Sequence, residues 1–256
     1  MKNNPLIELS EKCALVTGGS RGIGAAVCRQ LASAGANIMV GYRTRKADAE
    51  NVAGSCRAYG VNAATFAADV STHSGASALV DASMAELGAL DIFVGNAGIW
   101  PPADVALADM SDDQWHRTIR ENVDSIFFTT SAAVRAMRDG GSIVLISSTA
   151  GQRGESFHAD YAASKGAVIS LTKSLAVELG PRDINVNSVA PGWVDTEMVS
   201  DAVADAGRER IERSIPIGRI ASADDIAGPV VFLCSSMARH ITGEILNVNG
   251  GSVLCG

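Results

Sequence analysis

Short apolar runs alternate along this chain with longer segments in which apolar residues recur at helical spacing. The short runs predict strands at 13–18, 37–42, 63–70, 91–98, 142–148 and 184–192, with a last strand near EILNVN (244–249). The longer segments predict helices at 22–35, in the alanine-rich stretch ending near Tyr59, and at 78–88, 112–137 and 160–179, with a last helix beginning at Ser222.

The predicted strands are apolar on both faces, which is typical of a parallel sheet covered by helices on both sides. No internal repeat, low-complexity tract or linker interrupts the alternation of strands and helices. We therefore predict an α/β fold in which residues 1–256 form a single domain. The segment at about 195–220 is polar and is predicted to form a lid over a bound substrate.

Composition and charge narrow the possible functions. Hydrophobic residues make up 47% and charged residues 19% of the chain, the net charge is −7 and the pI is about 5.1. An acidic chain without a Lys/Arg-rich run is a poor nucleic-acid or anionic-membrane ligand, and no apolar stretch reaches the ~18 residues of a membrane span. Five scattered cysteines without a Cys-x-x-Cys pair favour buried thiols in a reducing cytoplasm, and no metal site is expected.

A glycine-rich loop, TGGSRGIG (17–24), follows the first predicted strand and leads directly into a helix. Gly18, Gly22 and Gly24 would let the backbone turn sharply and approach a pyrophosphate held at the helix N-terminus, with Ser20 and Ile23 beside it. The spacing Gly-x-x-x-Gly-x-Gly differs from the G-x-G-x-x-G fingerprint of other dinucleotide-binding folds. We predict a dinucleotide cradle in this loop.

The end of the second strand indicates which dinucleotide is preferred. NAD-binding proteins usually place an acidic residue there, but Tyr42 is followed by Arg43 and Arg45, and the first carboxylate is Asp48. Guanidinium groups match a 2′-phosphate well, and Arg21 in the glycine loop adds a further base. We therefore predict NADP(H) in preference to NAD(H). The alternative is that these arginines are merely solvated surface residues.

Tyr161 and Lys165 are spaced to lie on one face of the helix predicted at 160–179. An ordinary tyrosine has a pKa near ~10, and a neighbouring ammonium group would lower the pKa by stabilising the phenolate. The pair therefore predicts a general acid/base, with Tyr161 exchanging the proton. Ser148 stands thirteen residues before Tyr161 at the end of a predicted strand, whereas strand alternation turns Ser147 to the other face.

The glycine spacing, the Tyr-x-x-x-Lys pair and the Ser148–Tyr161 separation together resemble the short-chain dehydrogenase/reductase family, in its single-domain branch of about 250 residues. The resemblance extends from Leu9 to the closing NVNGG and implies a single-domain, Rossmann-like, doubly wound parallel sheet of about seven strands. It implies that Ser148 orients the substrate carbonyl and that Lys165 anchors the nicotinamide ribose. It also implies that Asn122 takes part in a proton relay. The alternative for Asn122 is a polar residue that kinks the long helix.

The same resemblance implies the remaining cofactor contacts. The Asp69 carboxylate would accept from the adenine amino group and the Val70 amide would face the ring, although Asp69 could instead cap a helix. Small residues would let the backbone pass the ribose, and a turn after the sixth strand would hold the carboxamide. The small residues beside the ribose are Asn96, Ala97 and Gly98, and the residues of the turn are Pro191, Gly192, Val194 and Thr196.

The resemblance implies reversible reduction of a ketone to a secondary alcohol, and the pattern looks most like 3-oxoacyl-carrier-protein reductases. Arg182 stands where such reductases carry a base for the acyl carrier, but Asp139 lies where another base would help. Arg135 and Arg138 could compensate for Asp139, so whether an acyl carrier protein binds stays open. The alternatives are a sugar, polyol or cyclic-alcohol dehydrogenase of the same family and, more remotely, a catalytically silent NADPH-sensing or scaffold protein.

Loops that follow the strands are expected to form the substrate pocket, because ligands of such sheets bind at the strands' carboxyl ends. Trp100, Phe157, His158 and Trp193 lie on these loops and are predicted to give the pocket an apolar lining, with His158 read as structural. By resemblance, the helices at 112–137 and 160–179 pack against another subunit, which predicts a homotetramer or a homodimer.

Overall fold

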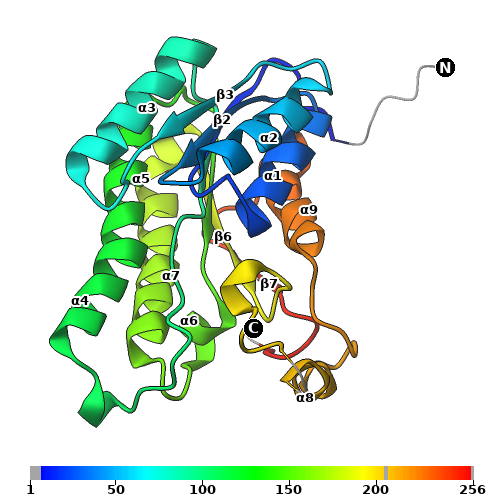
Figure 1. Cartoon of the computed structure of the whole chain (residues 1–256). Coiled ribbons are helices and arrows are strands. Elements are labelled where there is room, and N and C mark those ends of the chain that lie inside the picture. The colour runs from blue at the N-terminus through cyan, green and yellow to red at the C-terminus, as the bar shows by residue number, and fades with distance from the viewer. Residues whose placement is uncertain (1–6, 205–206, 255–256) are drawn as a thin grey trace.

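The structure is a computed structural model that describes residues 7–204 and 207–254, so the thiol of Cys255 and the two lid residues at 205–206 lie outside the described residues. One seven-stranded parallel sheet runs through the molecule in the order β3-β2-β1-β4-β5-β6-β7. Strand order reverses between β1 and β4, as in a doubly wound sheet. The predicted fold class is therefore confirmed (Figure 1).

The strands begin close to their predicted starts but most end earlier, because the residues after them turn into the loops of the site. Their bounds are β1 Cys13–Val16, β2 Asn37–Tyr42, β3 Ala63–Ala67, β4 Ile92–Gly95, β5 Ser142–Ile146, β6 Asn185–Pro191 and β7 Ile245–Val248. The α-helices are α1 Gly22–Ser33, α2 Lys46–Arg57, α3 His73–Leu87, α4 Asp112–Ile119, α5 Ser125–Ala136, α6 Thr149–Arg153, α7 Ala159–Leu179, α8 Gly207–Ser214 and α9 Ala223–Leu233.

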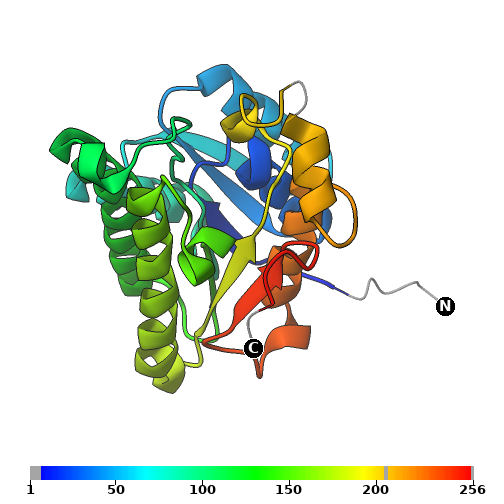
Figure 2. The same ribbon diagram turned by 90° about the horizontal axis from the view of Figure 1, so that it is seen from below.

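Successive strand residues enter two different hydrophobic cores, one on each face of the sheet. In β1, Ala14 and Val16 belong to the core under α1, α2 and α9, whereas Leu15 belongs to the core under α3, α5 and α7. The same alternation recurs in β4, where Ile92 and Val94 face one core and Phe93 the other. Figure 2 shows the two layers of helices with the sheet between them. Burial on both faces explains why the strands read as continuous apolar runs.

The long helix predicted at 112–137 is not continuous. It consists of α4, a π-helical turn at Arg120–Asp124 and α5. Two further helices, α6 and α8, were not predicted, and both are short: α6 has five residues and α8 has eight. The helix predicted at 78–88 begins earlier, at His73, because the Thr72 side chain caps its N-terminus by accepting from the Gly75 amide at 3.1 Å.

The carboxyl ends of the strands lie along one edge of the sheet, and the loops that leave β1 to β6 there supply most of the predicted site residues, while Asn122, Tyr161 and Lys165 lie on helical segments. Among the described residues, no helix is both long and apolar enough to cross a membrane. The same described ranges contain no cluster of three or more histidine, cysteine or acidic side chains able to hold a metal ion.

Candidate active site

The glycine loop forms a cradle whose shape excludes side chains. Gly18 and Gly22 adopt positive φ angles of 63° and 53°, a conformation that favours glycine. Gly24 lies beneath the cradle, and a Cβ there would stand 2.3 Å from the Gly18 carbonyl oxygen. Helix α1 begins at Gly22 without a side-chain cap, so its first amide groups remain available to an anion. Such a cradle fits a dinucleotide pyrophosphate.

Residues after β4 close one side of the cradle. The Thr17 hydroxyl accepts from the backbone amides of Asn96 and Ala97, both at 3.0 Å, and the Asn96 side chain donates to the Thr17 and Gly18 carbonyl oxygens at 3.0 and 3.2 Å. These bonds fix the predicted Asn-Ala-Gly segment, 96–98, against the glycine loop. Thr17 was not predicted as a site residue; the signal that could have found it is a hydroxyl residue directly after an apolar strand, and in the structure Thr17 is buried.

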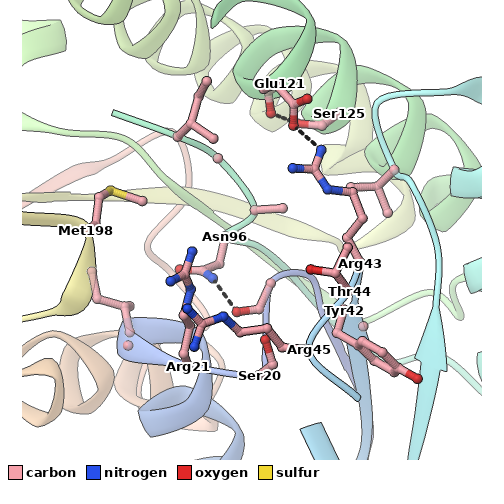
Figure 3. Close-up of a pocket in the computed structure, with 18 of the residues that line it drawn as sticks. Ser20, Arg21, Tyr42, Arg43, Thr44, Arg45, Asn96, Glu121, Ser125 and Met198 are labelled. Carbon is pink, nitrogen blue, oxygen red and sulfur yellow. Dashed lines mark hydrogen bonds and ion pairs between the residues drawn. The ribbon is translucent and has the colours of Figure 1, made fainter. Parts of the chain in front are cut away.

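The cofactor groove extends from this cradle to the ends of β2 and β3. It is lined by Gly18, Ser20, Arg21, Gly22, Ile23, Tyr42, Arg43, Arg45, Asp69, Val70, Asn96, Ala97, Gly98 and Thr196, among others (Figure 3). The Asp69 carboxylate accepts from the Ser71 amide and hydroxyl, and the latter bond is the main cause of its lowered pKa. The helix-cap alternative for Asp69 is wrong because Thr72 caps α3.

The three arginines of the groove are paired with carboxylates that are distant in the sequence. Glu197 bridges two of them, with its Oε2 at 2.8 Å from both Arg21 Nη1 and Arg45 Nη2. Arg43 Nη1 lies 2.6 Å from Glu121 Oε2, an ion pair drawn in Figure 3. The bond from Arg21 is the main cause of the lowered pKa of Glu197. The guanidinium groups of Arg21 and Arg45 thus meet at Glu197, where an anionic ligand would replace the carboxylate, whereas the Arg43 guanidinium points to Glu121.

A second pocket adjoins the first and contains the predicted acid/base group. Ser148, Tyr161 and Lys165 line it together with Pro191, Gly192, Val194 and Thr196. Ser148 forms a side-chain hydrogen bond with Tyr161, and Lys165 Nζ lies 5.8 Å from the centre of the Tyr161 ring. The Ser147 hydroxyl donates instead to the Lys165 backbone oxygen at 2.8 Å. The sequence-predicted trio therefore converges in one pocket.

Helix α6 sets the distance between Ser148 and Lys165. The Ser148 hydroxyl caps α6 by accepting from the Ala150 amide at 3.1 Å. One turn later, Gly151 lies so close to α7 that a Cβ would stand 2.5 Å from the Lys165 backbone carbon. Because only glycine permits this approach, α6 can press the serine loop directly against the helix that carries Tyr161 and Lys165.

The protonation states in this pocket differ from the sequence-based expectation. Burial raises the pKa of Tyr161 to about 12, and the charge of Glu155 also raises it, whereas the Ser148 hydrogen bond lowers it. Burial lowers the pKa of Lys165 to about 8. The expectation that Lys165 brings the pKa of Tyr161 below its usual value is wrong for this structure, because loss of solvation is the largest influence on the phenol and Lys165 Nζ donates to the Ile146 carbonyl oxygen at 2.8 Å. Tyr161 is therefore a protonated phenol at neutral pH.

This protonation state can be measured by following tyrosinate absorbance as the pH is raised, in the protein without added cofactor. We expect the difference between wild type and Tyr161→Phe to show no ionisation of Tyr161 below pH ~10, the usual pKa of the side chain. Because the folded pKa is raised, the neutral phenol stabilises the fold up to that pH, and the stabilisation is lost as the pH rises towards 12. A difference signal with a midpoint below pH 9 would contradict this.

Asn122 is buried behind the pocket, within the π-helical turn, rather than on the pocket wall. Its Oδ1 accepts from the Ile99 amide at 2.7 Å, and its Nδ2 donates to the Ile99 carbonyl oxygen at 2.9 Å and to Ser164 Oγ at 3.0 Å. The helix is irregular here, as the alternative for Asn122 supposed. Asn122 and Lys165 nevertheless approach the same point, because a Cβ on Gly98 would meet both.

Aromatic side chains form one wall of the second pocket, although not in the full set that was predicted. Trp100 and Trp193 line the pocket with their rings 6.0 Å apart at 80°, and His158 stacks on Trp100 at 4.9 Å from behind. His158 is buried and its Nδ1 lies 3.3 Å from the Ser156 carbonyl oxygen, which agrees with a structural role. The prediction for Phe157 is wrong: its side chain is 55% exposed and does not line the pocket.

Arg182 is engaged in holding the fold together. Its guanidinium donates to the Asp139 carboxylate at 2.8 Å and to the carbonyl oxygens of Val134 and Met137, both at 2.7 Å, at the C-terminal end of α5. Arg138 lies 3.9 Å from Asp91, and Arg135 donates to Ser131. The bases considered for an acyl carrier therefore already have partners within the chain.

A parallel doubly wound sheet, a dinucleotide cradle and an adjoining Ser-Tyr-Lys pocket define a class of nicotinamide-dependent oxidoreductases. The family model described as "Enoyl-(Acyl carrier protein) reductase" matches residues 18–252. Together with the relatives and the solved structure below, this match shows that the chain belongs to the short-chain dehydrogenase/reductase family.

Individual relatives cover almost the whole chain. An L-rhamnose 1-dehydrogenase (NAD(P)(+)) of Azotobacter vinelandii is 36% identical, over 95% of this chain and 97% of the relative. A 3-oxoacyl-[acyl-carrier-protein] reductase of Salmonella typhimurium is 40% identical, over 94% and 96%. A short-chain dehydrogenase of Burkholderia cenocepacia, solved in complex with NADP, is 38% identical with a TM-score of 0.89, over 96% of this chain and 99% of that one.

Proposed function

We propose that this chain is an NADP(H)-dependent oxidoreductase that interconverts a ketone and a secondary alcohol, with Tyr161 as the acid/base. The observation that carries the proposal is that Ser148, Tyr161 and Lys165 meet in a pocket continuous with the glycine cradle. A catalytically silent sensor or scaffold would not need all three side chains. The catalytic set is Asn122, Ser148, Tyr161 and Lys165.

The protonated phenol suits carbonyl reduction. When bound, the cofactor supplies the hydride to the carbonyl carbon. Ser148 donates a hydrogen bond to the carbonyl oxygen and orients it, and the Tyr161 hydroxyl delivers its proton to that oxygen as it gains negative charge. Lys165, whose pKa is about 8, is mostly protonated at neutral pH and can restore the proton. Asn122, which approaches Gly98 together with Lys165, links this group to solvent.

The arginines of the groove support NADP(H) as the preferred cofactor. Arg21 and Arg45 meet at Glu197, Arg43 lines the same groove, and no acidic residue ends β2. The relatives agree, since one is named for both NAD and NADP and another was solved with NADP. The pyrophosphate would lie on the amides of the cradle at Gly18–Gly24, and Thr196 and Val194 would hold the carboxamide.

The relatives suggest two substrate classes, an acyl thioester carried by acyl carrier protein and a sugar. We take residues 1–256 to act as one domain, in the cytoplasm. We assign segment 195–220 as the lid, because Glu197, Met198 and Val199 line the two pockets. The exposed Phe127 on α5 and Val177 on α7, which are 54% and 82% exposed, support assembly through these helices as a homotetramer or homodimer.

The direct test is to follow NADPH and NADH oxidation with acetoacetyl thioesters, quinones, cyclic ketones and sugars as oxidants. We expect turnover with at least one ketone and a lower KM for NADPH than for NADH. Tight NADPH binding without turnover across this panel would instead support a sensor or scaffold. A clear preference for NADH would overturn the assignment of the arginines.

The bridge from Glu197 to Arg21 and Arg45 gives a sharper prediction on the cofactor. A 2′-phosphate must displace the Glu197 carboxylate, so Glu197→Gln should lower the Kd of NADPH by about two- to fivefold, the effect of an exposed ion pair. The Kd of NADH should hardly change, because NADH has no phosphate there. Titration of cofactor fluorescence measures both constants.

The control for that experiment is Glu209→Gln, which removes an exposed carboxylate paired with Arg213 elsewhere in the lid segment. It should leave both dissociation constants as in the wild type. Equal changes for NADPH and NADH in Glu197→Gln would show that the carboxylate acts on lid position rather than on the phosphate site.

A further inference from the structure

A carboxylate, Glu155, lines the same pocket as Ser148 and Tyr161. It follows α6 after Gly154, whose φ of 78° turns the chain back towards the pocket. Glu155 is half-buried, and its charge is one of the causes that raise the pKa of Tyr161. An acidic side chain therefore lies within electrostatic range of the group that handles the proton. No step of the proposed reduction uses it.

The surroundings of Glu155 leave most of its hydrogen-bonding capacity unused. Burial raises the pKa of Glu155, while a hydrogen bond from the Trp100 side chain and the nearby His158 and Arg153 lower it. Within the part of the chain that the structure describes, the Trp100 indole is the side chain that donates to this carboxylate. A carboxylate can accept about four hydrogen bonds. A substrate that displaces water from this wall must therefore supply donors, because an unsatisfied carboxylate is costly to bury.

The charge balance around Glu155 favours neutral donors over a cation. Arg153 lines the pocket on an exposed position two residues before Glu155, and its guanidinium would oppose a second positive charge. An anionic group beside Glu155 would be repelled by the carboxylate. Hydroxyl groups satisfy the carboxylate without either conflict. The donors that fit are therefore those of an alcohol.

The aromatic wall of the pocket, by contrast, favours an apolar surface on the substrate. Trp100 both donates to Glu155 and presents its ring to the pocket, and Trp193 stands nearly perpendicular to it at 6.0 Å. A carbon ring can lay its C–H groups against the indoles while hydroxyl groups at its edge reach the carboxylate. Apolar contact and hydroxyl recognition thus act on one small cyclic molecule, whereas a linear acyl chain would leave Glu155 unpaired.

We propose that Glu155 is a specificity-determining residue that selects hydroxylated cyclic ketones and the corresponding polyols or sugars, by accepting hydrogen bonds from a hydroxyl group beside the reacting carbon. This rests on the proposed ketone reduction. It deepens that proposal by choosing the hydroxylated class over the acyl thioester. Tyr161 and Ser148 act on the carbonyl oxygen, while Glu155 acts on the neighbouring hydroxyl.

The test compares cyclohexanone with 2-hydroxycyclohexanone, using NADPH and the full-length protein, in wild type, Glu155→Gln and Glu155→Leu. Wild type should prefer the hydroxyketone in kcat/KM by about tenfold or more, the effect of a hydrogen bond to a charged group. Glu155→Leu should lose this preference, mainly through a higher KM for the hydroxyketone. Glu155→Gln keeps the shape and part of the hydrogen bonding, so it should fall between the two.

Controls separate this inference from the proposed function. Glu86→Gln, an exposed site on α3 outside both pockets, should keep the wild-type preference, and thermal melting reports whether each variant folds. If wild type reduces no ketone at all, the proposed function fails. If it reduces both ketones with a ratio that Glu155→Leu does not change, or prefers an acetoacetyl thioester to the hydroxyketone, the role of Glu155 is overturned.

Discussion

Replacing Tyr161 by phenylalanine is expected to lower kcat for ketone reduction by about 10²–10⁴-fold, the usual contribution of general acid/base catalysis. Burial raises the pKa of Tyr161 to about 12, so the wild-type residue holds its proton until the carbonyl oxygen becomes basic. Phenylalanine keeps the ring and its packing but has no proton to give. The alkoxide would then depend on water, which the pocket wall restricts.

Steady-state rates and NADPH titration together check this prediction. The Kd of NADPH should stay close to the wild-type value in Tyr161→Phe, because the glycine cradle and the arginines bind the far end of the cofactor. Tyr59→Phe removes a hydroxyl from a residue that is 57% exposed and outside both pockets, so it serves as the matched control. A Tyr161→Phe enzyme with wild-type kcat would refute the assigned acid/base.

The second large effect is expected at Gly24, beneath the cradle. An alanine Cβ would lie 2.3 Å from the Gly18 carbonyl oxygen, which is backbone, and 2.6 Å from Asn96 Nδ2, which is held by hydrogen bonds to the Thr17 and Gly18 carbonyl oxygens. To relieve these close contacts, the glycine loop and the Asn-Ala-Gly segment would have to move apart. We expect Gly24→Ala to destabilise the fold by about 3 kcal/mol, the upper range for overpacking, and to lower Tm by roughly 6–12 °C.

The same displacement should weaken NADPH binding, because the cradle would lose its shape. Gly54→Ala is the matched control: Gly54 is an exposed position in α2, where a Cβ would meet only the end of the Arg57 side chain at 3.9 Å. That substitution should stabilise the protein by about 0.5–1 kcal/mol through helix propensity. Gly24→Ala with an unchanged Tm and an unchanged NADPH Kd would show that the cradle tolerates a side chain.

The strands were predictable because local sequence determines them. Residues such as Leu15 and Phe93 face one core while their neighbours face the other, and this demand for apolar residues on both faces leaves a continuous run in the sequence. Helix α6 was missed because a five-residue helix is too short to show periodicity and contains Gly151. The π-helical turn was missed because it depends on bonds from Asn122 to Ile99, which is remote in the sequence.

The pocket residues were predictable where their spacing along one element carried the signal, as for Tyr161 and Lys165. Their partners were not, because the fold brings them together from distant positions. Glu197 lies 176 residues after Arg21, and Glu121 lies 78 after Arg43. The predicted direction of the Tyr161 pKa shift was wrong for a similar reason. The sequence shows the neighbouring ammonium group, but the burial of the phenol, which raises its pKa, appears only in the folded chain.

The π-helical turn at Arg120–Asp124 also limits how this scaffold can be redesigned. A π-helical turn holds more residues than an α-helical turn, so α5 starts out of phase with α4. Each residue of an α-helix turns the chain by about 100°, so winding these residues as regular α-helix without removing one would rotate every side chain of α5 by about that angle relative to α4. Engineers who idealise this helix at constant length would therefore turn part of the buried face of α5 towards solvent, and a design should preserve the irregular turn as a fixed unit.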